Sequence, residues 1–152
     1  KHQRALNALG VVCQQEGEFD EALRWYREAQ QKFPNDSSAF YNAGLILFNK
    51  GKQLRKEIEE KKLLQSQDAV VEGEQDSDPH SQSSVAIVST QQDQLAQQQR
   101  NLQKTNGAAQ KMFEKAARRG HVLAYFQLGS LTSSEKQYDH AFRYFSKGAR
   151  KG

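Results

Sequence analysis

Several kinds of residue are scarce in this sequence, and their scarcity excludes whole classes of protein. The single cysteine, Cys13, excludes a disulfide bond within the chain. Cys13 also falls at an apolar position of a helical pattern, which favours a small buried side chain over a reactive thiol. No apolar run is long enough to cross a bilayer, and the first residues form no signal-peptide pattern. The sequence therefore predicts neither a disulfide-linked scaffold nor a membrane span.

Residues that carry catalysis or bind metals are sparse as well. No histidine has a carboxylate or cysteine at metal-ligand spacing; the four are His2, His80, His121 and His140. The acidic residues between Glu72 and Asp78 lack the ordered spacing of a calcium-binding loop. There is no glycine-rich phosphate loop, nucleophile elbow or HExxH motif. We therefore expect no enzyme, no catalytic residue, no metal ion and no cofactor.

Charge is nearly balanced along the 152 residues. The chain has 22 basic and 18 acidic residues, a net charge of +4 and an isoelectric point near 9.2. This excess is mild and no predicted face is strongly basic, so we do not expect nucleic-acid binding. Apolar residues are placed unevenly, because both ends of the chain are apolar and periodic whereas the middle is polar.

The stretch from Leu6 to Pro34 predicts two short antiparallel helices. Apolar residues fall at helical spacing over residues 4–15, and Gly17 then breaks the run. Asp20 is a plausible N-cap for a second helix, which Pro34 ends. Small side chains at the expected contact points allow the two helices to approach closely. One such hairpin cannot bury both apolar faces, so neighbouring hairpins must stack on it.

These residues also follow the pattern of a known repeat, in which a large apolar residue, a Leu-Gly pair and a tyrosine precede Ala-x3-Phe and a proline. The matching positions are Leu6, Leu9, Gly10, Cys13, Ala22, Tyr26 and Pro34. The stretch resembles a tetratricopeptide repeat, although Leu6 replaces the usual tryptophan and Cys13 the usual tyrosine. The resemblance implies a helical hairpin within an α-solenoid.

Two further hairpins follow the first. Gly44 comes one tetratricopeptide repeat length after Gly10, and the helix expected next appears only around Phe113. The third hairpin contains Leu128-Gly129. The run Lys-Ala-Ala-Arg-Arg-Gly-His at residues 115–121 resembles the Sel-one-like repeat, a related helical hairpin.

The interval between repeats predicts an insertion. The interval from Gly44 to Gly129 exceeds one repeat length by about 51 residues, so the second hairpin is split between its helices. We expect an all-α, right-handed α-solenoid of about three hairpins. Its parts are hairpin 1 (1–36), the first helix of hairpin 2 (37–51), a polar insertion rich in Gln, Ser and Asp (52–106), the second helix of hairpin 2 (107–120), and a Sel-one-like hairpin 3 (121–152) of a longer array.

The insertion has two interpretations. Thin apolar stripes in its flanks, Lys52–Gln67 and Gln91–Lys104, favour an antiparallel helical arm that extends the split hairpin. The alternative, which the composition alone also allows, is a disordered polar loop. Fast hydrogen exchange across both flanks would exclude the arm. Val85–Val88, a short apolar run, is interpreted as a docking motif or a loose strand.

The tetratricopeptide resemblance also implies a binding site, because the first helix of each hairpin in that family lines the inner groove of the superhelix. Carried over by matching positions, the partner-binding groove comprises Arg4, Asn7, Val11, Gln14, Tyr41, Asn42, Leu45, Asn49, Leu123, Phe126 and Gln127. Amide side chains can satisfy a partner's backbone, and the apolar ones can grip its side chains. For Leu45, Leu123 and Phe126 the alternative is packing against an adjacent helix.

The expected function is that of a non-catalytic adaptor or scaffold that binds a protein or peptide partner in this groove. Two alternatives stay open: an architectural subunit of a large assembly, such as a ribonucleoprotein, and an accessory domain of a larger enzyme. We expect an intracellular, cytoplasmic location, while an organelle or the secretory lumen stays open. The sequence leaves the oligomeric state undetermined.

Overall fold

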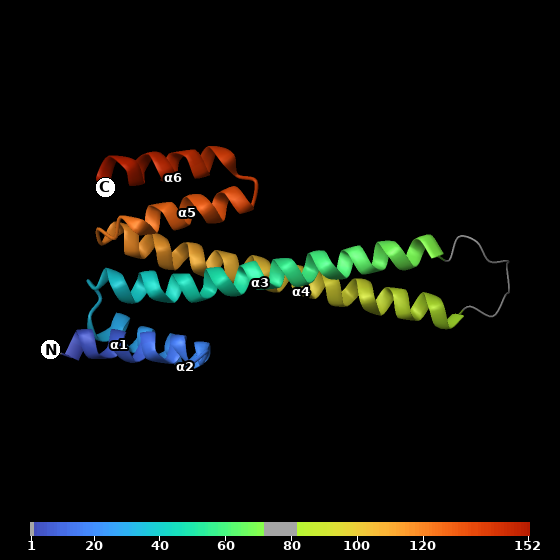
Figure 1. Ribbon diagram of the computed structural model, residues 1–152, viewed down its shortest axis with the longest axis horizontal. Helices are drawn as coiled ribbons and strands as arrows, with labels where there is room; N and C mark the ends of the chain where they lie inside the picture. Colours follow the sequence, from blue (N-terminus) through green and yellow to red (C-terminus); the bar gives the residue numbers. More distant parts are fainter. Residues whose placement is uncertain (1, 72–81) are drawn as a thin grey trace. The chain divides into compact units, whose positions relative to one another are not determined.

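The described part of the chain consists of α-helices and the connections between them (Figure 1). The computed structural model describes residues 2–71 and 82–152, without the side chains of residues 68–71 and 82–88. The acidic residues between Glu72 and Asp78, and His80, lie outside the described residues. The helices are α1 (His2–Gln15), α2 (Phe19–Lys32), α3 (Ser37–Val71), α4 (Gln82–Arg118), α5 (Leu123–Ser134) and α6 (Tyr138–Lys151). The predicted all-α fold of helical repeats is confirmed.

Two compact units make up the chain. Unit 1 comprises Lys1–Asn49 and Thr105–Gly152, and unit 2 comprises Lys50–Lys104. Helices α3 and α4 each contribute one part to unit 1 and the other part to unit 2. Unit 1 therefore holds four complete helices, the beginning of α3 and the end of α4.

Unit 1 repeats one contact three times. In each case an aromatic ring from the second helix of a hairpin lies against a glycine of the first helix. A Cβ atom added at the glycine would lie 2.5–2.7 Å from the nearest ring carbon, so a larger residue could not occupy the position without a shift. The pairs are Gly10 with Tyr26, Gly44 with Phe113, and Gly129 with Phe145.

The middle pair shows which segments form the second hairpin. Tyr26 follows Gly10 at the same interval as Phe145 follows Gly129, whereas Gly44 and Phe113 are much farther apart in the sequence. Phe40 at the start of α3 belongs to the same buried apolar cluster as Phe113. This contact joins the two segments that the sequence predicts to be the legs of one hairpin.

Neighbouring hairpins share apolar cores. Between the first and second hairpins, one cluster contains Ala22 and Tyr26 of α2 with Ala43 and Ile46 of α3. Between the second and third, another contains Ala109 and Phe113 of α4 with Leu128 and Leu131 of α5. Alanine lies beside each bulky residue in both clusters, so the helices approach closely while the rings fill the remaining space.

Left-handed residues end three helices of unit 1. Gly17 after α1 has a φ of 84°, Gly120 after α4 has 87°, and Lys136 after α5 has 62°. At the first turn the N–H of Glu18 donates to the carbonyl oxygen of Cys13 at 2.8 Å, and the other two turns contain the equivalent bond. This pattern satisfies carbonyl groups at the helix end and favours glycine, because a side chain is strained at positive φ.

Replacing Lys136 with glycine should therefore stabilise the protein. Lys136 alone among these three residues carries a Cβ atom, and relief of its left-handed backbone should raise the free energy of unfolding by about 0.5–1 kcal/mol. Urea denaturation followed by circular dichroism measures the change. Lys136→Ala is the matched control, because alanine keeps the Cβ atom while removing the same charge. An equal gain from alanine would contradict the explanation by backbone strain.

Unit 2 is an antiparallel pair of helical segments from α3 and α4 (Figure 1). Both flanks that the sequence predicts to be helical lie within these segments. Ile58 is buried, and Leu54, Leu95 and Leu102 are half-buried. One surface hollow is lined from both helices, by Lys61, Leu64, Gln65, Gln91, Gln94 and Leu95. The thin apolar stripes thus face one another, while most other side chains of the pair are exposed.

Two local interpretations were wrong. Val85–Val88 is part of α4, so it is not a loose strand, while the docking motif stays a prediction. Asp20 is not the N-cap of α2, which begins at Phe19 after Glu18 and has no side-chain cap hydrogen bond. The apolar run at 85–88 is compatible with helix, and the long helix around it determined the outcome. Asp20 instead lies in the first turn of α2.

Candidate protein-binding surface

The expected groove residues all lie in unit 1, on α1, on the first part of α3 and on α5. The exposed members are Arg4, Val11, Asn49, Leu123 and Phe126. The half-buried members are Asn7, Gln14, Tyr41, Asn42, Leu45 and Gln127. The exposed ones can meet a partner directly, whereas the half-buried ones must be judged by their contacts within the chain.

Asn7 has a structural partner. Its Nδ2 donates a hydrogen bond to Oδ2 of Asp36, which is buried just before α3. Asp36 also accepts a hydrogen bond from the backbone N–H of Ser38 through Oδ1, at 3.0 Å. The carboxylate thus caps the start of α3 and ties it to α1. The amide of Asn7 serves this connection, which the sequence pattern did not reveal.

Gln14 and Asn42 meet the buried hydroxyl of Tyr26. That hydroxyl donates a hydrogen bond to Oε1 of Gln14 at 3.3 Å. Burial raises the pKa of Tyr26, while a hydrogen bond with Asn42 acts in the opposite direction. The ring of Tyr26 lies against Gly10, so its hydroxyl is buried with it. The two amides therefore give this hydroxyl the hydrogen-bond partners that it would otherwise lack.

Tyr41 is held by two rings. It stacks on His121 with ring centroids 4.0 Å apart and an angle of 15° between the planes. It also lies 5.9 Å from the ring of Phe113 in a tilted arrangement. Burial lowers the pKa of His121 below its ordinary value of 6.5, and the negative charge of Asp36 partly opposes the shift. The imidazole is thus a neutral packing partner of Tyr41 near pH 7.

Acidification should consequently weaken the fold through His121. Because the folded-state pKa is lowered, the unfolded chain binds the proton more readily. The contribution to stability is complete above pH 6.5 and is lost as the pH falls from there toward the folded-state pKa. Urea midpoints at several pH values measure the loss, and His121→Gln should make the profile flatter. His140→Gln, at an exposed histidine, should leave it unchanged; equal flattening by both variants would contradict the assignment.

Leu123 and Phe126 form an exposed apolar pair on one of the first helices. They are one turn apart on α5, and their exposed fractions are 55% and 39%. One edge of Phe126 packs on α6, where its ring centroid lies 6.4 Å from that of Phe145. Leu45, in contrast, packs against the buried cluster around Phe113. The packed alternative therefore holds for Leu45, whereas Leu123 faces solvent.

Arg119 forms a further contact that the sequence did not reveal. Its guanidinium carbon lies 4.2 Å from the ring centroid of Phe40, and its Nε donates a hydrogen bond to the carbonyl oxygen of Pro34. It thereby connects the end of α4 to the turn before α3. The basic run at residues 115–119 was visible in the sequence, but its role within the fold depends on a turn that is distant along the chain.

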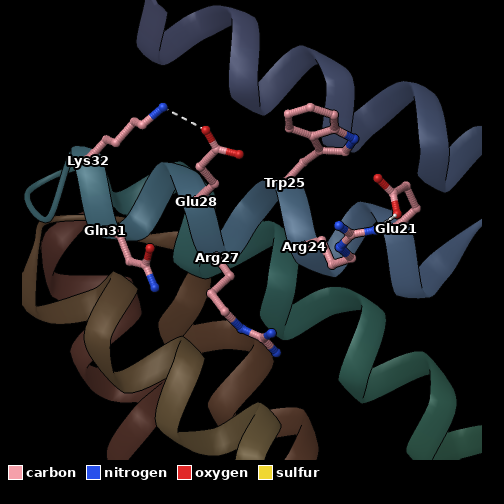
Figure 2. Close-up of a pocket in the computed structure, with 7 residues that line it drawn as sticks. All are labelled: Glu21, Arg24, Trp25, Arg27, Glu28, Gln31 and Lys32. Carbon is pink, nitrogen blue, oxygen red and sulfur yellow. Dashed lines mark hydrogen bonds and ion pairs between the residues drawn. The ribbon is translucent and has the colours of Figure 1, made fainter.

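A hollow on the surface of α2 is lined by five charged residues, one glutamine and one tryptophan (Figure 2). Glu21 pairs with Arg24 at 2.8 Å and Glu28 with Lys32 at 2.6 Å. Trp25 packs against the buried cluster of Leu6, Ala29 and Ala39. Arg27 and Gln31 point to the other side of α2 from Trp25 (Figure 2). Exposed ion pairs of this kind contribute little to stability.

Two features are absent from the part of the chain that the structure describes. Among those residues, no three histidine, cysteine, aspartate or glutamate side chains group closely enough to hold a metal ion. No helix within residues 2–71 and 82–152 combines the length and apolarity needed to cross a bilayer.

Unit 1 defines a helical-repeat protein, built from hairpins that stack through alanine and ring contacts. Residues 3–36 match the family model of the tetratricopeptide repeat, so the first hairpin is a tetratricopeptide repeat. Such repeats generally mediate protein–protein interaction, and their all-helical fold is typically non-catalytic. No curated protein sequence matches the chain significantly. Because the family match covers the first hairpin, the Sel-one-like resemblance of the third stays a prediction.

Proposed function

We propose that unit 1 is the binding module of a non-catalytic adaptor or scaffold, and that it holds a partner peptide or helix on its first helices. The chain would divide into hairpins at the boundaries given by the sequence, with unit 2 as an insertion in the second. The proposed contact residues are Arg4, Val11, Asn49, Leu123, Phe126 and Gln127. A cytoplasmic, intracellular location is part of the proposal and agrees with the unpaired thiol of Cys13.

One observation carries this proposal: the exposed pair formed by Leu123 and Phe126. Large apolar side chains that are half exposed on one helix face can anchor a partner's apolar side chains. Gln127 lies next to them and can donate to or accept from a partner's backbone. Val11 on α1 is a further exposed apolar side chain on a first helix. A helix or an extended peptide with spaced apolar residues fits this chemistry.

The test is a selection of binding peptides from a displayed random library, with the whole chain as bait. Selected peptides should carry spaced apolar residues, and Leu123→Asp should weaken their binding at least about tenfold, the equivalent of about 1.4 kcal/mol. Leu63→Asp is the matched control, because Leu63 in unit 2 has an exposed fraction of 60%. Failure to select any peptide, or equal weakening by both variants, would overturn the proposal.

A further inference from the structure

The positive charge of the chain is concentrated in its last third. Residues 105–152 contain nine lysine and arginine residues against three aspartate and glutamate residues, which gives this part a net charge of +6. The whole chain has a net charge of +4, so residues 1–104 carry a net charge of −2. The nearly balanced composition of the sequence therefore conceals a strongly basic part of unit 1.

Six of these cations occupy equivalent positions on the second helices of two hairpins. On each helix they stand two positions before, two after and five after the residue whose ring lies against a glycine. With 3.6 residues per turn, these positions lie opposite the ring, on the side of the helix that faces away from the first helix. All six are exposed: Lys111, Lys115 and Arg118 on α4, and Arg143, Lys147 and Arg150 on α6.

The two rows are on neighbouring helices. The hydroxyl of Tyr144 on α6 donates a hydrogen bond to Oε1 of Glu114 on α4 at 3.4 Å. Tyr144 also packs against the buried cluster around Phe113. Burial raises the pKa of Tyr144, and the positive charge of Arg118 opposes that rise, so Arg118 lies near the hydroxyl. The six cations thus form one surface of unit 1, which we call the basic face.

The cations of the basic face are not paired with carboxylates. None of the six forms an ion pair within the described part of the chain. Glu114, which lies between the rows, accepts its hydrogen bonds from Tyr144 and from Nε2 of Gln110. On α2 the equivalent positions begin with Arg24, which is paired with Glu21, and continue with Glu28. A hairpin of unit 1 therefore folds without a basic row, so the rows on α4 and α6 are not required for the fold.

Neither the helix dipole nor the end of the sequence explains the basic face. Basic residues in the last turn of a helix complement its dipole, which accounts for Lys115, Arg118 and Arg150. Lys111 and Arg143 lie about two turns before their helices end, where the dipole has little effect. The α4 helix is followed by another hairpin and still exposes its row, so the exposure of these positions does not depend on where the sequence ends.

We propose that the basic face binds the phosphate backbone of double-stranded nucleic acid. Lysine and arginine in fixed rows can neutralise several phosphates without reading the bases. The rows contain no aromatic or large apolar side chain, so they offer neither a stacking surface for unpaired bases nor an anchor for a membrane. Lysine is depleted at protein–protein interfaces, whereas nucleic-acid interfaces are strongly positive. Charge complementarity thus favours a nucleic-acid duplex over an acidic polypeptide.

Fluorescence anisotropy with the whole chain and a labelled RNA or DNA duplex of about 20 base pairs tests the proposal. Between about 50 and 200 mM salt, the logarithm of the association constant should fall linearly with the logarithm of the salt concentration. The slope should be about −3 or steeper, because each neutralised phosphate contributes about −0.9. The double variant Lys111→Gln and Arg143→Gln should weaken binding at least about tenfold and make the slope shallower by about 2.

The matched control is the double variant Arg24→Gln and Arg27→Gln, which removes two exposed positive charges from α2. It should leave the affinity within about twofold and the slope unchanged. Equal weakening by both double variants would show that the chain binds through its overall charge and would overturn the proposal. No duplex binding by the parent chain at about 50 mM salt would also overturn it. So would tighter binding of polyglutamate, of anionic phospholipid vesicles or of a single strand of equal length.

The basic face is separate from the proposed peptide-binding surface. Its cations lie on second helices, whereas the proposed peptide contacts lie on first helices. Neither double variant alters a proposed peptide contact, so the two proposals can fail independently.

Discussion

Truncation of Phe113 to alanine should lower the free energy of unfolding by about 3–5 kcal/mol, the range expected when a buried aromatic side chain is removed. The ring of Phe113 is fully buried, lies against Gly44 and belongs to the cluster that joins the second and third hairpins. It also contacts the rings of Tyr41 and Phe48. One side chain thus connects both legs of the split hairpin to the next hairpin. Chemical denaturation followed by circular dichroism measures the loss.

Phe142→Ala is the matched control for this experiment. It removes the same ring from α6, where the side chain is 72% exposed, so we expect a change within about 0.5 kcal/mol. A loss for Phe113→Ala no larger than the loss for Phe142→Ala would contradict the place of Phe113 at the centre of unit 1.

The sequence revealed the hairpins because their contacts depend on residue type at fixed spacing. A glycine against which an aromatic ring packs cannot be replaced by a larger residue without a shift. Gly10, Gly44 and Gly129 therefore mark the first helices, even where an insertion separates the two legs of the hairpin. The helical form of the described flanks was one of two interpretations. Glutamine, glutamate and lysine are good helix formers, and the few apolar residues lie at positions where two helices can bury them.

The partners of polar side chains could not be derived from periodicity. A helical pattern gives the face on which a residue lies, but it does not give the residue that approaches from another helix. The pattern therefore placed Asn7 in the groove, although Asp36 holds its amide. It also placed Leu9 in an apolar packing stripe, although that side chain is exposed. Gly51 shows the same dependence on context, since it lies within α3 and a left-handed turn is needed only where the chain must reverse.

This dependence on context leads to a deletion experiment. Removal of residues 52–104 would bring Gly44 and Phe113 to the same separation in sequence as the other two glycine and ring pairs. Gly51 would then stand as far after Gly44 as Gly17 stands after Gly10, and would precede Thr105 directly. We expect the shortened chain to fold cooperatively, with a midpoint of thermal unfolding within about 4–8 °C of the parent value, the shift caused by about 1 kcal/mol.

Two variants of the shortened chain test its conformation and not merely its solubility. Gly51→Val should lower the free energy of unfolding by about 1–2 kcal/mol, because a β-branched residue is strained in the left-handed turn that Gly51 must now form. Phe113→Ala should still lower it by about 3–5 kcal/mol, because the ring should keep its place against Gly44. A shortened chain that unfolds without cooperativity, or one that tolerates both substitutions, would show that the helices of unit 2 are needed to hold α3 and α4 in register. If both substitutions lower the free energy of unfolding as expected, the contacts of unit 1 are sufficient for the fold. The polar segment can then serve another purpose.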